Sequence, residues 1–131
     1  MANPNILTAT SILGTTTYLT PAVNTAVVLL PNAASSGKVL KINQIVAANV
    51  DGSAAYSTTV SLYSNGAVAK GSAPSGGTAY PIVSTVSVPA NSSLVAVDKT
   101  TAIYLMEGQS ITVTSSTASK FTYTISYEEI S

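Results

Sequence analysis

The sequence Phe121-Thr-Tyr-Thr-Ile-Ser-Tyr-Glu128, near the end of the chain, decides the class of the fold. Four aromatic or aliphatic side chains alternate with four polar ones without a break. Successive side chains of a β-strand point to opposite faces of a sheet, so this alternation predicts a strand with one buried face and one solvated face. Elsewhere, no stretch of ten or more residues combines helical spacing of apolar residues with helix caps. We therefore expect extended structure throughout the chain.

Short apolar segments precede this strand, and turn sequences such as Asp51-Gly52 separate them. Asn65-Gly66 is typical of a tight hairpin, and Pro81 predicts that its strand lies at a sheet edge or contains a bulge. We expect extended segments at residues 6–19 (bent at Gly14), 25–30, 39–50, 56–64, 80–88, 93–97, 101–106 and 110–114. Eight or nine short strands predict an all-β fold, a single-domain antiparallel β-sandwich of jelly-roll type spanning residues 1–131.

The same pattern predicts which residues form the core and which remain mobile. Residues 1–5 are expected to be a flexible N-terminal arm, and residues 71–78, Gly-Ser-Ala-Pro-Ser-Gly-Gly-Thr, a flexible loop. The residues expected to be mostly buried are Val27, Leu29, Ile42, Val60, Leu62, Ile82, Val86, Ile111, Val113, Tyr123 and Ile125.

The composition excludes several classes of chemistry. The 131 residues include no Cys, His, Arg or Trp, only 8% are charged, and the formal net charge is zero. Acid–base catalysis near neutral pH, thiol chemistry and zinc binding lose their usual side chains. The five lysines are scattered, so we expect no nucleic-acid binding. We also expect no membrane span and no secretory signal, and hence synthesis in a cytoplasm.

The carboxylates are Asp51, Asp98, Glu107, Glu128 and Glu129, and each has a structural interpretation. Asp51 and Asp98 lie beside turn residues, where short acidic side chains usually cap backbone N–H groups. The alternative is a calcium site formed by Asp51 or Asp98 with loop carbonyls. Glu107 precedes a tight turn, and Glu128 and Glu129 point to opposite faces of a strand. We therefore predict no catalytic, cofactor-binding or metal-binding residues, and no cofactor.

Two other chemical hypotheses are weak. A Ser–Lys dyad is available in principle, but no motif supports one. The glycines of residues 71–78 lack the Gly-Lys-Ser/Thr ending of a phosphate-binding loop. Among the aromatic residues, Tyr56 stands at the start of a strand, and Tyr63 falls on the polar face of the same strand. We consider Tyr63 a candidate interface residue.

From about residue 30 onward, a series of turn and strand sequences resembles the small virion structural proteins of tailed phages, especially those infecting marine cyanobacteria. The residues that carry the resemblance are Asn-Ala-Ala-Ser-Ser-Gly-Lys-Val at 32–39, Ala-Ala-Asn-Val-Asp-Gly at 47–52, Ser-Thr-Val-Ser-Val-Pro-Ala at 84–90, Ile-Tyr-Leu-Met-Glu-Gly-Gln-Ser-Ile at 103–111 and Ser-Tyr-Glu-Glu-Ile at 126–130. The resemblance implies a virion component with a β-sandwich fold and no catalytic residues.

We therefore expect a non-enzymatic capsid decoration or cement protein, located in the virion and made in the host cytoplasm. Its expected partners are the major capsid protein or other virion proteins. A charge-poor surface and unprotected strand edges also predict a homo-oligomer, for example a trimer. The alternative is a receptor- or glycan-binding module of the neck, tail or fibre, which a cluster of exposed Tyr and Asn beside a carboxylate would favour. A glycan hydrolase would need a cleft with two facing carboxylates.

Overall fold

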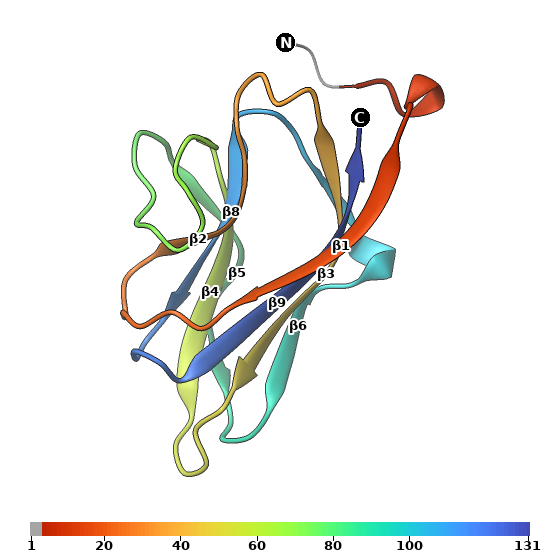
Figure 1. Ribbon diagram of the computed structural model, residues 1–131. Helices are drawn as coiled ribbons and strands as arrows, with labels where there is room; N and C mark the ends of the chain where they lie inside the picture. The colour runs from red at the N-terminus through yellow and green to blue at the C-terminus, as the bar shows by residue number, and fades with distance from the viewer. Residues whose placement is uncertain (1–3) are drawn as a thin grey trace.

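Two antiparallel sheets pack face to face in the computed structural model, which describes residues 4–131 (Figure 1). The first, which we call the β1 sheet, has the order β1-β9-β3-β6, with β7 also paired to β3. The second, the β2 sheet, has the order β2-β8-β4-β5. The strands are β1 (Ile12–Leu19), β2 (Val27–Asn32), β3 (Val39–Asn49), β4 (Tyr56–Tyr63), β5 (Ala79–Val88), β6 (Ser93–Val97), β7 (Ile103–Leu105), β8 (Gln109–Ser115) and β9 (Phe121–Ile130).

This arrangement confirms the predicted antiparallel β-sandwich. Strand β9 lies between β1 and β3, and its alternating residues Phe121, Tyr123 and Ile125 are fully buried between the sheets. Two short 3-10 helices, η1 (Ile6–Thr8) and η2 (Lys99–Thr101), are the helical segments of residues 4–131. No helix in this range has the length and apolar character needed to span a membrane.

The predicted core is confirmed except at its margin. Of the residues expected to be buried, all but Leu62, Ile82 and Val86 are buried, and these three are half-buried. Ile82 and Val86 belong to β5, an edge strand whose pairing with β4 contains two register shifts. Pro81 also lies in β5, so this strand is both an edge strand and bulged, as the sequence predicted.

The N-terminal segment and the Asn65-Gly66 sequence differ from prediction. Residues 6–19 do not form one extended segment bent at Gly14, because η1 occupies its start and β1 runs through Gly14 in unbroken register with β9. Of the predicted arm, residues 1–3 lie outside the described part of the chain, and the Asn5 side chain caps η1. Asn65-Gly66 does not form a tight hairpin, because a long loop of residues 64–78 joins β4 to β5.

That loop folds back over the outer face of the β2 sheet, which corrects two predictions. Residues 71–78 are anchored, because Gly71 N–H donates to the Val28 carbonyl at 2.8 Å and Val28 N–H donates to the Ser72 carbonyl at 2.9 Å. Tyr63 is buried rather than exposed, and its hydroxyl accepts a hydrogen bond from Gly77 N–H at 3.0 Å. The hypothesis that Tyr63 is an interface residue is therefore wrong, because its outward face is covered by the protein's own loop.

Candidate functional site

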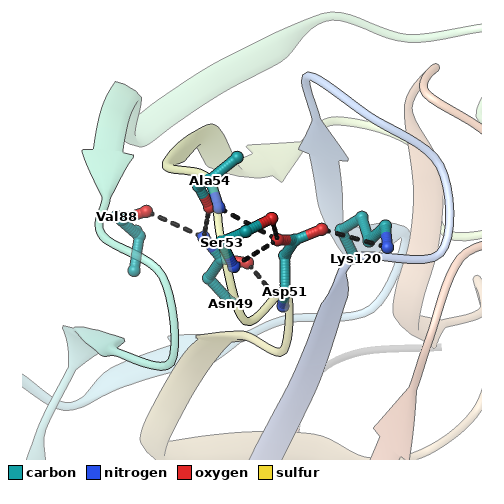
Figure 2. A network of polar contacts seen from close by, with 6 residues as sticks. All are labelled: Asn49, Asp51, Ser53, Ala54, Val88 and Lys120. Atoms are coloured by element: carbon teal, nitrogen blue, oxygen red, sulfur yellow. Dashed lines mark hydrogen bonds and ion pairs between the residues drawn. The ribbon is translucent and has the colours of Figure 1, made fainter.

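Asp51 lies in a hydrogen-bonded network at one end of the sandwich, in the turn between β3 and β4 (Figure 2). Its Oδ1 accepts hydrogen bonds from Ser53 N–H at 2.7 Å, Ser53 Oγ at 2.9 Å and Ala54 N–H at 2.9 Å. Its Oδ2 lies 3.0 Å from Lys120 Nζ. Both carboxylate oxygens are thus occupied by the turn and by a lysine from the loop before β9.

These contacts explain the charge state of the network. The Ser53 backbone N–H, followed by the Lys120 ammonium and the Ala54 N–H, lowers the pKa of Asp51 well below its ordinary value. The Asp51 carboxylate in turn raises the pKa of Lys120. A carboxylate stabilised in this way is ionised at all physiological pH values and is unsuited to act as a general acid or base.

Asp98 and Glu107 also bond to backbone groups. Asp98 is the N-cap of η2, and its Oδ1 accepts from the backbone N–H groups of Thr100 and Thr101. The Thr100 hydroxyl contributes most to lowering the pKa of Asp98. Glu107 Oε1 accepts from Gly37 N–H at 2.6 Å. The capping interpretation of Asp51 and Asp98 is therefore the one that the contacts support.

The remaining carboxylates lie beside lysines. Glu129 forms an ion pair with Lys38, and Glu128 lies 3.7 Å from Lys41 across neighbouring strands. Within residues 4–131, no three metal-ligating side chains come together and no pocket is found. A glycan hydrolase needs two carboxylates that face each other across a cleft, and no such cleft is found in this range.

Two buried asparagines that the sequence analysis missed connect the sheets at opposite ends of β3. At its end, Asn49 Nδ2 donates to the Val88 carbonyl of β5 at 2.9 Å and to the Ala54 carbonyl at 3.0 Å (Figure 2). Near the start of β3, Asn32, the last residue of β2, donates through Nδ2 to the Leu105 carbonyl of β7 at 3.0 Å. Both residues end a strand, a position usually explained by turn formation, so their bridging role has no local sequence signal.

The outer faces of the two sheets differ in accessibility. On the β2 sheet, the outward row Val28, Thr112 and Ser61 is buried, at 0%, 3% and 4% exposure, because the loop of residues 64–78 lies over this face. On the β1 sheet, Tyr18 and Val95 point outward and are 71% and 50% exposed. The β1 sheet therefore presents the more open outer face.

We call the middle of this open surface the docking face. One row across it contains Tyr18 of β1, Thr124 of β9, Val46 of β3 and Val95 of β6. Flanking rows hold Thr16, Ser126 and Gln44 on one side and Thr20, Thr122, Ala48 and Ser93 on the other. No residue of these rows is charged.

Four hydroxyl groups of the docking face are ordered by hydrogen bonds. Thr16 Oγ1 lies 2.9 Å from Ser126 Oγ, and Thr20 Oγ1 lies 2.9 Å from Thr122 Oγ1, so each pair shares a hydrogen bond between neighbouring strands. Ordered hydroxyls and half-buried aliphatic groups lose little conformational entropy when a partner covers them. The surface is thus suited to binding a complementary protein surface.

The exposed tyrosines do not gather into a sugar-binding cluster. Tyr18 lies on β1, Tyr104 on β7 and Tyr80 on β5 of the other sheet, so three separate strands carry them. Tyr104 is opposite Lys41, which lies opposite Glu128 in turn, but its neighbours in this row include no asparagine. A glycan-binding site of the kind expected from sequence is therefore not assembled by these residues.

Comparison with known proteins gives no relative. No family model, no curated protein and no solved structure matches this chain.

Proposed function

We propose that this protein is a structural component of a tailed-phage virion, most simply a capsid decoration or cement protein that binds and stabilises the shell. The resemblance of residues 30–131 to such proteins is the sequence argument. The structural observation that carries the proposal is the docking face, an open sheet surface whose rows contain no charged residue, with Tyr18 and Val95 exposed. Such a surface gains affinity from complementary packing, and repetition over a lattice multiplies weak contacts.

We further infer that the sandwich is a jelly roll. Strands β6 and β7 both pair with β3, so they act as one strand interrupted by η2. Counted in this way, the first strand pairs with the last, the second with the seventh, the third with the sixth and the fourth with the fifth. This nested pairing is expected when one long hairpin wraps into two sheets, an architecture that also occurs in viral capsid domains. The fold alone does not imply the function.

The alternative is a module of the neck, tail or fibre that binds a receptor or glycan. It would be present in a few copies at the neck, tail or fibre, whereas a decoration protein would follow the capsid lattice. The position of the exposed tyrosines on separate strands favours the decoration protein. Its partners would be the major capsid protein or neighbouring virion proteins.

Copy number separates the two proposals. Quantitative mass spectrometry of purified particles would give the ratio of this protein to the major capsid protein. We expect copies on the order of hundreds per particle, at a fixed lattice ratio. A handful of copies, or immunogold labelling confined to the tail tip, would replace the decoration proposal by the fibre alternative.

Matched variants test the docking face itself. Val95→Lys places a charge in the central row of the face, at its β6 end, while Val23→Lys alters an exposed valine in the loop before β2. In rebinding to particles that lack the protein, we expect Val95→Lys to weaken binding by about tenfold or more and Val23→Lys to bind like the natural chain. Equal binding of both variants would exclude this face as the contact.

A further inference from the structure

The four edges of the two sheets are not equally protected against pairing with another strand. Strand β2 is covered, because Gly71 and Ser72 hydrogen-bond to Val28. Strand β5 contains Pro81 and two register shifts, with Thr85 in a left-handed conformation at a φ of 50°. The β6/β7 edge is short and interrupted by η2. Proline, bulges, short strands and covering loops are devices that prevent edge-to-edge association.

Within residues 4–131, strand β1 has none of these devices over most of its length. Its residues Ile12–Leu19 pair with β9 without a register shift and include no proline and no charged side chain. It is the outermost strand of its sheet (Figure 1), and Ile12, Leu13 and Tyr18 are 61%, 59% and 71% exposed. An open, regularly paired and partly apolar edge of this length is a template for a further strand.

The hydrogen bonds at the start of β1 fix which backbone groups face the open edge. Ser11 and Ser131 exchange two backbone hydrogen bonds, at 3.0 Å and 2.9 Å. Hydrogen-bonded positions alternate along an antiparallel pair, so Leu13, Thr15, Thr17 and Leu19 bond to β9. The N–H and C=O groups of Ile12, Gly14, Thr16 and Tyr18 therefore point to the open edge.

We propose that β1 pairs with β1 of a second copy of this chain, antiparallel and about a two-fold axis at Thr16, to join two β1 sheets into one. In this register Leu13 lies opposite Leu19 of the second copy, so two partly exposed leucines cover one another. Tyr18 lies opposite Gly14, where a side chain would meet nothing within 4 Å, so the ring has open space to occupy. Because the pairing is isologous, each of these contacts forms twice.

The charges beside β1 are complementary in the same register. Lys70 Nζ lies 2.5 Å from Thr17 Oγ1 and 5.8 Å from the centre of the Tyr18 ring, at one end of the strand. Glu128 lies opposite Gly14 at the other end, and its contact with Lys41 is long, at 3.7 Å. In the antiparallel pairing, Tyr18 and Lys70 of one copy approach Glu128 of the second copy, and the two-fold axis repeats this contact.

A second copy fits this edge better than a ring of copies would. A trimer needs β1 to meet a different edge of the next copy, and each of the other edges is covered, bulged or interrupted. Self-pairing needs only the open edge and closes after two copies. This inference stands apart from the virion proposal, since a dimer forms in solution whether or not the protein binds a particle.

Sedimentation of the purified chain tests the proposal. We expect a dimer at concentrations on the order of tens of micromolar, with Thr16→Lys raising the dissociation constant by about tenfold or more, because two lysines then meet at the axis. Ser87→Lys, on the protected edge strand β5, is the matched control and should leave the dimer unchanged. Circular dichroism and thermal melting verify that both variants are folded.

Cross-linking tests the register independently. The chain has no cysteine, so Thr16→Cys introduces one thiol on the axis, which a short bismaleimide should link into a covalent dimer. Ser87→Cys should form no covalent dimer under the same conditions. A monomer at all concentrations, a dimer that tolerates Thr16→Lys, or cross-linking at Thr15→Cys instead of Thr16→Cys would each overturn the proposal.

Discussion

The substitution Asn49→Asp keeps the size of a buried side chain and removes its two N–H donors. Asn49 is 2% exposed, and its Nδ2 satisfies the Val88 and Ala54 carbonyls, while Oδ1 accepts from Asp51 N–H at 3.0 Å. In the variant, both carbonyls face a carboxylate. Each buried acceptor left without a donor costs about 1–3 kcal/mol, and the buried charge adds to this. We expect the free energy of unfolding to fall by about 3–5 kcal/mol at pH 7.

The pH dependence of this loss has a definite sign. Burial beside two carbonyls raises the folded-state pKa of the new carboxyl above its unfolded value of about 3.9. The protonated form is thus favoured in the folded state, so the deficit relative to the natural chain is smallest below about pH 4 and grows as pH rises through the folded-state pKa. The protonated acid also regains one donor for a carbonyl.

Urea denaturation between pH 4 and pH 7, followed by circular dichroism, measures this deficit. Asn24→Asp, at an exposed position in the loop before β2, is the matched control and should stay within about 0.5 kcal/mol of the natural chain. The reasoning would be refuted if Asn49→Asp lost less than about 1 kcal/mol at pH 7, since each orphaned carbonyl alone should cost that much. A loss that does not change with pH would also refute it.

Four further results are expected. Ile125→Ala, at a fully buried site, should lower the free energy of unfolding by about 2–5 kcal/mol in urea denaturation. Burial raises the pKa of Tyr123 from 10.0 to about 12. The stability that this buried, neutral tyrosine contributes is therefore complete below pH 10 and is lost as pH rises towards 12. In thermal melts, Tyr123→Phe should reduce the fall in melting temperature over this alkaline range. Thr85→Gly should raise stability by about 0.5–1 kcal/mol, because a Cβ is strained at a φ of 50°, and Thr85→Ala, which keeps the Cβ, should not. Chelator should leave the melting temperature unchanged, because Asp51 and Asp98 already accept hydrogen bonds from their own turns; a drop of many degrees would restore the calcium hypothesis.

Local alternation predicted the strands well because the apolar residues within each strand mark the face that is buried. Strand β9 shows this most clearly, and β6 has the predicted bounds, residues 93–97. Tyr63 was misplaced by the same logic. Its alternation with Leu62 correctly assigns it to the outer face of β4, but that face is buried by the loop of residues 64–78. Periodicity reports the face of a sheet and carries no information on a loop that returns to cover it.

Two glycines of that loop are required by its close packing against the sheet, but only the structure reveals this role. A Cβ at Gly66 would lie 2.1 Å from the Asn32 carbonyl oxygen, and one at Gly77 would lie 2.9 Å from the Tyr63 ring. Both positions need glycine because the loop lies directly against the sheet. From sequence alone, Gly77 indicated flexibility and Gly66 a tight hairpin turn, since close packing, turns and chain freedom all favour glycine.

The distribution of charge explains why a nearly uncharged chain should associate specifically rather than aggregate. The ion pairs Lys38–Glu129 and Lys120–Asp51 lie near opposite ends of β3, so electrostatic repulsion between copies is weak over the middle of the sheets. Protection against association must then come from backbone geometry, and three of the four edges have it in the form of a covering loop, a bulged strand with Pro81, and a strand interrupted by η2. Composition alone predicts a protein that associates. It cannot show which edge strand is open to pairing, because the edge strands contain similar aliphatic and uncharged polar residues. The order of the strands in the two sheets shows that the open edge is β1, and β1 borders the docking face. If two copies paired through β1, their docking faces would therefore lie side by side in one continuous surface.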